Sequence, residues 1–202
     1  MTLASSVDLL AENPAVFSVL RKILEVGFVR QKRWIQQLFT LTSENRVLDI
    51  GCGTGEFAPL FKIAHYWGID ISRSYAAHAR KKTGQEILVM DGNRLAFKSE
   101  RFDYILIMAV LHHLKDEAVI QVLAEAKRVL KPEGRVLVME DTKIEAFDSL
   151  LVRWVQKYDK GAYIRNSQAY KAMISDFFTI KDEWPFRSGA CAYAAFFLEK
   201  PH

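Results

Sequence analysis

Residues 47–57 have the sequence VLDIGCGTGEF. An apolar run leads into a turn in which three glycines, Gly51, Gly53 and Gly55, alternate with other residues, and a helix is expected to follow the turn. Glycine lets the backbone turn tightly and approach a ligand without a Cβ atom in the way. In doubly wound sheets such a turn lies at the carboxyl end of the first strand, where ligands bind. The stretch therefore predicts the first strand of an α/β sheet with a binding site directly after it.

Short apolar runs alternate with helical stretches along the rest of the chain. The runs cover residues 46–50, 66–71, 87–90, 104–109, 135–140, 177–180 and 194–198, and helical periodicity covers residues 72–82 and 116–130. Strands that alternate with helices imply crossover connections and a parallel sheet with helices on both faces. The last two runs lie close together, so a hairpin can make one of them antiparallel.

The N-terminal segment has a helical pattern of its own over residues 14–40, which Gly27 is expected to divide in two. We expect one domain: a helical extension or lid at residues 1–42, a cofactor-binding core at 43–142, and substrate-side helices and C-terminal strands at 143–202. The lid would shape an apolar acceptor pocket around Phe17, Phe28, Trp34 and Phe39.

Acidic residues stand at the ends of three successive predicted strands. Asp49 ends the first, Asp70 the second and Asp91 follows the third. An acid about twenty residues after a glycine loop can accept both hydroxyls of a ribose, and Asp91 can accept the exocyclic amine of adenine. Ile71 and Met90 are expected on either side of that ring.

Dinucleotide-binding proteins are the main rival, because they also place a glycine loop after the first strand. Their spacing is G-x-G-x-x-G, and the helix N-terminus that follows holds a pyrophosphate. Here the third glycine comes one residue early, and Glu56 takes the place of the expected glycine. The carboxylates of Asp49 and Glu56 would repel a pyrophosphate, so the loop is expected to favour a cationic ligand.

These motifs resemble those of the class I S-adenosylmethionine-dependent methyltransferases, small-molecule branch. Residues 49–55, DIGCGTG, are similar to the cofactor motif of the family, and Asp70 and Asp91 match its ribose-binding and adenine-binding acids. The segments 102–114 and 128–135 resemble the fourth-strand motif and the turn before the fifth strand, with Glu133 where the family usually has glycine. The resemblance implies a seven-stranded doubly wound sheet whose last strand is antiparallel, with S-adenosylmethionine as cofactor and S-adenosylhomocysteine as product.

The expected site has three parts. The cofactor is assigned to Asp49, Gly51, Cys52, Gly53, Gly55, Asp70, Ile71, Met90, Asp91, Gly92 and Ala109, with Arg30 as a cation for its carboxylate. Transfer of a methyl group needs alignment above all, and a base only where the acceptor must lose a proton. His112 or His113 is the candidate base, and the alternative is that both cap and pack. Tyr158, Tyr163 and Arg165 are candidate acceptor contacts in a loop that equally fits an ordinary connector.

Composition leaves several partners open. The 202 residues carry a net charge of +4, and the two cysteines, Cys52 and Cys191, are far apart in the sequence, which favours a reducing, cytoplasmic setting without a disulfide framework or metal site. Neither a signal peptide nor a membrane span is expected. A small-molecule acceptor is favoured. A nucleic-acid methyltransferase is disfavoured, because the histidine pair stands where amino-group nucleic-acid enzymes carry an Asp/Asn-Pro-Pro-aromatic motif. A non-catalytic cofactor-binding protein remains the third hypothesis, and the oligomeric state and the methylated atom stay undetermined.

Overall fold

The computed structural model describes residues 14–142, 163–189 and 191–201. Its strands are β1 (Arg46–Ile50), β2 (His65–Asp70), β3 (Glu86–Val89), β4 (Phe102–Met108), β5 (Leu130–Asp141), β6 (Thr179–Ser188) and β7 (Cys191–Glu199). Its helices are α2 (Pro14–Leu24), α3 (Val29–Leu38), α4 (Arg73–Thr83), α5 (Asp116–Val129) and α7 (Ser167–Ser175), with short 3₁₀ turns η1 (Val26–Phe28), η2 (Ala58–Phe61) and η3 (Leu111–His113).

The seven strands form one sheet in the order β3-β2-β1-β4-β5-β7-β6. The first five strands are parallel, while β7 runs antiparallel between β5 and β6. The predicted doubly wound sheet with an antiparallel last strand is therefore confirmed. The strand order reverses between β1 and β4, and this is the point where open α/β sheets bind ligands.

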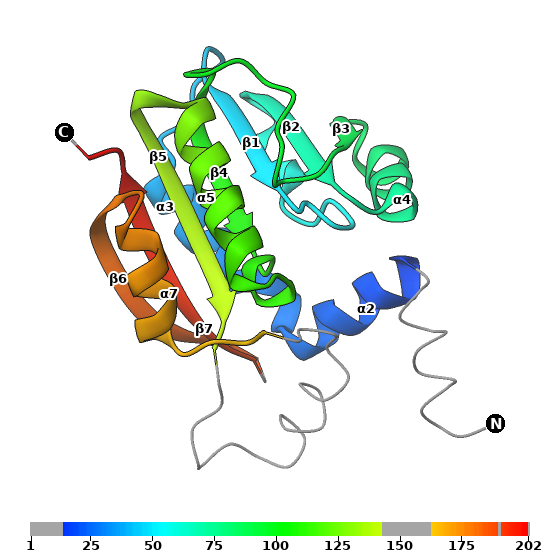
Figure 1. Ribbon diagram of the computed structural model, residues 1–202. Helices are drawn as coiled ribbons and strands as arrows, with labels where there is room; N and C mark the ends of the chain where they lie inside the picture. The colour runs from blue at the N-terminus through cyan, green and yellow to red at the C-terminus, as the bar shows by residue number, and fades with distance from the viewer. Residues whose placement is uncertain (1–13, 143–162, 190, 202) are drawn as a thin grey trace.

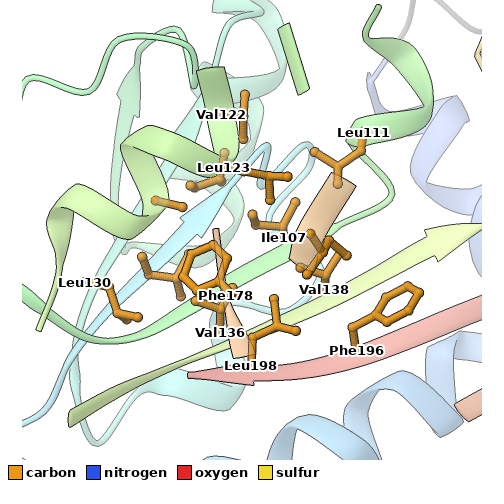
Figure 2. Close-up of a cluster of buried hydrophobic side chains, with 14 of the residues drawn as sticks. Ile107, Leu111, Val122, Leu123, Leu130, Val136, Val138, Phe178, Phe196 and Leu198 are labelled. Atoms are coloured by element: carbon orange, nitrogen blue, oxygen red, sulfur yellow. The ribbon is translucent and has the colours of Figure 1, made fainter. Parts of the chain in front are cut away.

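Helices cover both faces of the sheet, as Figure 1 shows. Residues of β4 and β5 alternate between the two faces because successive side chains of a strand point in opposite directions. Ile107, Val136 and Val138 pack with α5 and α7, and Figure 2 shows this cluster with Phe178 and Leu198 closing it. The other face buries Ile35 of α3, Phe61 of η2, and Ala76 and Ala79 of α4.

Two expected elements differ from the structure. A helix was expected directly after the glycine loop, but the chain forms only η2 there, with Pro59 near its start. Nine residues separate Gly55 from β2, too few for a long helix and its connections. The sixth strand was expected at residues 177–180, but β6 runs to Ser188 because its whole length pairs with β7.

The N-terminal segment divides at Gly27, as predicted. Gly27 has a φ of 69°, and α2 and α3 lie on either side of η1. Within the parts of the chain that the structure describes, no helix combines the length and apolar character needed to cross a bilayer.

Candidate functional site

A cavity of about 620 Å³ opens at the carboxyl ends of β1 to β4. This volume falls within the range of about 300–1,000 Å³ that is typical of small-molecule sites. Twelve of the predicted site residues line it: Asp49, Gly51, Cys52, Gly53, Asp70, Ile71, Met90, Asp91, Gly92, Ala109, His112 and His113. The strand ends thus bring together residues that are up to 64 positions apart in the sequence.

The glycine loop is held by its own main chain. The amides of Gly51 and Cys52 both donate to the carbonyl of Ile69, at 2.8 and 2.9 Å, and the amide of Gly53 donates to Asp70 Oδ2 at 2.9 Å. These three amides therefore shape the loop, and a cation is expected to meet the carboxylate end of an amino-acid ligand.

Gly51 and Gly55 have different reasons for being glycine. Gly51 has a φ of 72°, and a Cβ atom there would clash with the side chain of Val110. Gly55 lies outside the cavity lining. A Cβ atom on Gly55 would meet Thr83 Cγ2 at 2.9 Å, so this glycine allows the loop to pack on α4.

Asp70 is fixed by two main-chain amides. Its Oδ2 accepts from Gly53 and its Oδ1 from Ser72 at 2.8 Å. Burial raises the pKa of Asp70, although these two hydrogen bonds oppose the rise. Each carboxylate oxygen has a second lone pair, so a pair of ligand hydroxyls can still be accepted.

Asp49 is 1% exposed and accepts a hydrogen bond from the Tyr66 hydroxyl at 2.8 Å. Burial raises the pKa of Asp49 to about 7, and the neighbouring charge of Asp70 adds to the rise. A buried carboxyl of this kind is stabilised in its charged form by a cation. This arrangement fits the ammonium group of an amino-acid ligand.

Glu56 is neutralised from three sides. Its carboxylate pairs with Lys32 at 2.8 Å, Lys22 at 3.1 Å and Lys82 at 3.2 Å. Burial alone would raise the pKa of Glu56, but the hydrogen bonds from Lys32 and Lys22 outweigh it and hold that pKa below its ordinary value. The sequence argument that Glu56 repels a pyrophosphate is therefore weakened, and the acidic character of the loop rests on Asp49 and Asp70.

The third strand end offers two acceptors. Asp91 is exposed, and its Oδ1 accepts from the amide of Asn93 at 2.9 Å. Asn93 also lines the cavity, and its buried side-chain oxygen meets no hydrogen-bond donor among the described residues. Because this oxygen is buried, a ligand amine could reach it only after the side chain turns toward the cavity. Asn93 was missed by the sequence analysis, which read only the acid of the motif.

The two histidines have different surroundings. His112 is fully buried, with Nδ1 at 2.9 Å from Glu140 Oε2 and Nε2 at 3.7 Å from Asp141 Oδ2. His113 is exposed at the cavity, and its ring centroid lies 4.0 Å from that of His112. The geometry therefore favours His113 as the histidine that can meet a ligand and His112 as its support.

Glu140 holds the loop that carries both histidines. Its fully buried carboxylate accepts from the amides of Val110 at 2.9 Å, Leu111 at 2.8 Å and His112 at 3.3 Å. Together with the His112 ring, these donors surround the charge. The connection after β4 is thus fixed by the end of β5.

Arg21 lines the cavity, whereas Arg30 is exposed and does not. Arg21 Nη2 lies 2.9 Å from the Tyr193 hydroxyl and 3.8 Å from Asp141 Oδ2, and the guanidinium pairs with Glu25. The kink at Gly27 separates α2 from α3, so the two arginines take different directions. The described cavity lining therefore includes Arg21 and not Arg30.

Arg165 does not line the cavity. Its five guanidinium N–H groups are engaged by Asp116 Oδ1, twice, and by the carbonyls of Leu111, Tyr163 and Leu114. The predicted clamp on an acceptor anion is thus contradicted by the geometry, because no donor remains. Tyr163 is 37% exposed and lies outside the lining, and Tyr158 lies outside the described residues.

The N-terminal aromatic residues serve different purposes. Phe28 lines the cavity and meets Phe57 edge-on at 5.6 Å between ring centroids. Trp34 instead packs against Trp184 at 4.6 Å and Phe39 against Tyr104 at 4.6 Å, which fixes α3 to the sheet. The expected pocket therefore includes Phe28 but neither Trp34 nor Phe39, and the side chain of Phe17 lies outside the description.

Comparison with known proteins agrees with this site. Residues 48–138 match the family described as a methyltransferase domain. An uncharacterized protein of Methanocaldococcus jannaschii is 38% identical over 107 residues, which cover 53% of this chain and 50% of that protein. A tRNA (carboxymethyluridine(34)-5-O)-methyltransferase of Arabidopsis thaliana is 36% identical over 58% of this chain and 29% of its own length. A ubiquinone/menaquinone biosynthesis C-methyltransferase of Desulfotalea psychrophila is 31% identical over 62% of this chain and 54% of its own length.

The chain thus spans about half, or less, of the length of these relatives. Among solved structures, geranyl diphosphate C-methyltransferase from Streptomyces coelicolor has a similar fold, with a TM-score of 0.71 at 12% identity over 85% of this chain and 76% of that chain. The matched domain, the sheet order and the ligand site at the strand reversal agree with one another. Residues 48–138 thus resemble a methyltransferase domain in sequence, and the sheet that they form is shared with a solved methyltransferase structure.

Proposed function

We propose that the cavity binds S-adenosylmethionine and that the protein transfers the methyl group to a small, largely apolar acceptor. The observation that carries the proposal is the set of acidic residues Asp49, Asp70 and Asp91, which meet a glycine loop in one cavity. The cofactor supplies a methyl group on a positively charged sulfur, which is an electrophile with its leaving group already in place. The protein has to bind, orient and exclude water.

Each end of the cofactor has a candidate partner in the cavity wall. Asp70 would accept the ribose hydroxyls, and Asp91 and Asn93 would accept the adenine amine beside Ile71 and Met90. Asp49 would meet the ammonium group. Arg21 is the arginine of the described lining, so it would meet the carboxylate.

His113 would accept a proton from an acceptor hydroxyl or acidic carbon. It is exposed in the cavity, and histidine titrates near neutral pH. His112, fixed by Glu140, would hold the connection after β4 in place. Positioning of this kind can lower a barrier by roughly 7–11 kcal/mol, so orientation is expected to matter more than the base.

A small apolar acceptor is supported by the remaining cavity wall. Phe28, Phe57, Val110 and Leu114 contribute apolar side chains to it. The relative from Desulfotalea psychrophila is named for quinone biosynthesis, and its match is the longest of the three reported above. The N-terminal helices contribute Arg21 and Phe28, which supports their role as a lid over the cofactor.

Transfer to tRNA is the second candidate. It is favoured by the 36% identity to the Arabidopsis thaliana tRNA enzyme and by the lysines around Glu56, which lie on three different helices. A tRNA substrate would lie across an exposed basic surface, and its base would have to enter the cavity.

Transfer of label from S-adenosylmethionine with a tritiated methyl group distinguishes the two. The protein is incubated with a demethylated quinol in one reaction and with unmodified tRNA in another. Label in the quinol that is lost in His113→Ala, with cofactor binding retained, supports a small apolar acceptor and a base. Label in tRNA alone contradicts this acceptor class while leaving the cofactor assignment intact.

A further inference from the structure

Exposed apolar side chains gather on the N-terminal helices. Ten large apolar residues are exposed in the described parts of the chain, and five of them fall within residues 16–29. They are Val16, Val19 (58% exposed), Ile23 (71%), Val26 (65%) and Val29 (55%). Val16, Val19 and Ile23 are three or four positions apart within α2, the spacing that places residues on one helical face, and Val26 and Val29 follow at the turn into α3. We call these five residues the outer stripe.

The outer stripe lies on the side of α2 that is turned away from the cavity. The opposite side of α2 carries Arg21, which lines the cavity, and leads to Glu25, which is 1% exposed. Figure 1 shows α2 below the carboxyl ends of the strands, at the rim of the sheet. The outer stripe therefore lies on a helix that contributes to the cavity wall, but it is not part of that wall.

The backbone that presents the outer stripe is strained. Val26 has a φ of 50° and Phe28 a φ of 59°, on either side of Gly27. A β-branched residue in the left-handed region is a genuine outlier, and such outliers gather at functional sites. Here the turn buries Phe28 against Phe57 but leaves Val26 exposed to solvent. Valine at position 26 is therefore strained without a buried side chain to offset the strain, so folding stability alone does not explain this residue.

The charges around the outer stripe are positive. Glu25 is the sole acid in residues 14–42, and it is buried. Arg30 and Arg33 are exposed, whereas Lys22 pairs with Glu56. The segment thus presents apolar and cationic groups to its surroundings, without an exposed carboxylate.

We propose that the outer stripe docks on the surface of an anionic phospholipid bilayer. A helix with apolar residues on one side and Lys or Arg beside them lies in the interface of such a membrane. A nucleic acid would match the cations but leave the apolar residues in water. A second copy would match the apolar residues but set like charges against each other, because a twofold interface pairs a surface with itself. An anionic bilayer matches both features.

Docking in this way brings α2, which contributes Arg21 to the cavity wall, to the membrane surface. The docking itself does not depend on the proposed methyl transfer, so it is tested without cofactor or acceptor.

Cosedimentation of the full chain with vesicles tests the proposal. Vesicles of phosphatidylglycerol and phosphatidylcholine are compared with vesicles of phosphatidylcholine alone, in low salt. The first should bind the protein and the second should bind it much more weakly. Ile23→Glu should weaken binding to the anionic vesicles by at least about tenfold. It removes an apolar side chain that docking would bury in the bilayer, and it adds a negative charge that the anionic lipids repel. Arg33→Gln should weaken it by about fivefold.

Ile63→Glu is the matched control. Ile63 is 61% exposed, close to the exposure of Val26, but it directly precedes β2 and so lies at the amino ends of the parallel strands, away from the ends that form the cavity. Binding of this variant to anionic vesicles should equal that of the wild type. Equal losses in Ile63→Glu and Ile23→Glu would overturn the proposal.

Val26→Asn separates docking from stability. Asparagine tolerates the left-handed backbone better than valine, so the melting temperature should rise while vesicle binding falls. The proposal would be overturned if the melting temperature and the vesicle binding of Val26→Asn fell together. It would also be overturned if the wild type did not bind anionic vesicles, or if it formed a dimer without vesicles that Ile23→Glu dissociates.

Discussion

Asp49 is a buried carboxyl group whose pKa lies close to neutral pH. Its pKa is raised to about 7 by burial, so the protonated form dominates below that pH and the carboxylate above it. The carboxylate is the form that pairs with an ammonium group. If Asp49 is the ammonium partner, as we propose, the charge state of this side chain sets how tightly the cofactor binds.

We therefore expect the affinity for S-adenosylhomocysteine to rise by about tenfold between pH 6 and pH 8, as the ionised fraction of Asp49 rises. Isothermal titration at several pH values measures this. The Asp49→Asn variant should bind more weakly and show a flat profile. A wild-type profile as flat as that of the variant would exclude Asp49 as the ammonium partner.

Gly51 and Gly84 provide a matched pair for the loop. Both have a left-handed backbone, with φ values of 72° and 68°, so alanine is strained at either position. A Cβ atom at Gly51 also clashes with Val110, whereas nothing lies within 4 Å of one at Gly84. Gly51→Ala should lower both the melting temperature and the cofactor affinity, and Gly84→Ala the melting temperature alone. Unchanged affinity in Gly51→Ala would contradict the assigned role of the loop.

Individual site residues could be predicted from the sequence where their role depends on their own residue type and on their neighbours in the chain. Glycine spacing and acids at strand ends are visible in a linear sequence, and twelve predicted residues do line the cavity. Arg165 and Arg30 were assigned differently from what the geometry supports. A long cationic side chain takes its role from partners far along the chain, such as Asp116 for Arg165, which no spacing rule indicates.

The N-terminal helices are fixed to the sheet by buried polar groups. Glu25 accepts hydrogen bonds from Gln31 at 2.7 Å and from the Tyr193 hydroxyl at 2.8 Å, and it pairs with Arg21. The Ser188 hydroxyl donates to the carbonyl of Glu25 at 2.9 Å. The tip of the β6–β7 hairpin thus supports the segment that lines the cavity.

Glu25 should make this attachment sensitive to pH. Burial raises its pKa from 4.5 to about 7, although Arg21 opposes the rise. The folded protein then keeps a proton that the unfolded chain loses, so the stabilisation is present below about pH 4.5 and is lost as the pH rises to 7. In the wild type, the free energy of unfolding should therefore fall by up to about 3 kcal/mol over this pH range. In Glu25→Gln, this fall should be absent.

Chemical denaturation at pH 5 and pH 8 measures that difference. The Glu44→Gln variant, which changes an exposed acid, serves as the control and should follow the wild type. A wild-type and a Glu25→Gln protein that respond equally to pH would contradict the role of Glu25.

Elements were predictable where the periodicity was strong. The break at Gly27 and the strands β1 to β4 follow patterns that are confined to a few residues. The lengths of β6 and β7 were not visible, because pairing with a partner strand extends them through residues such as Lys181, Asp182 and Glu183, which are polar and exposed. The missing helix after Gly55 follows from the short connection to β2.

In the whole molecule, the topology creates the site. The chain builds β1 to β3 in one direction and then returns to place β4 beside β1, so four strand ends surround one crevice. Alternating strands and helices predict this arrangement, and the antiparallel pair of β6 and β7 adds a hairpin whose Ser188 supports the N-terminal segment. The acceptor is the part that the sequence did not predict, since the side chains that select it come from segments without a shared motif.

The central claim is that this crevice holds S-adenosylmethionine, and calorimetric titration with S-adenosylhomocysteine tests it most directly, with NAD as the comparison ligand. Asp70→Ala is the test variant, and Asp103→Ala, which removes an acid paired with Lys131 outside the cavity lining, is the control. We predict micromolar binding of S-adenosylhomocysteine (Kd about 1–10 μM), none of NAD, at least about tenfold weaker binding in Asp70→Ala, and unchanged binding in Asp103→Ala. Binding of NAD without binding of S-adenosylhomocysteine would contradict the account.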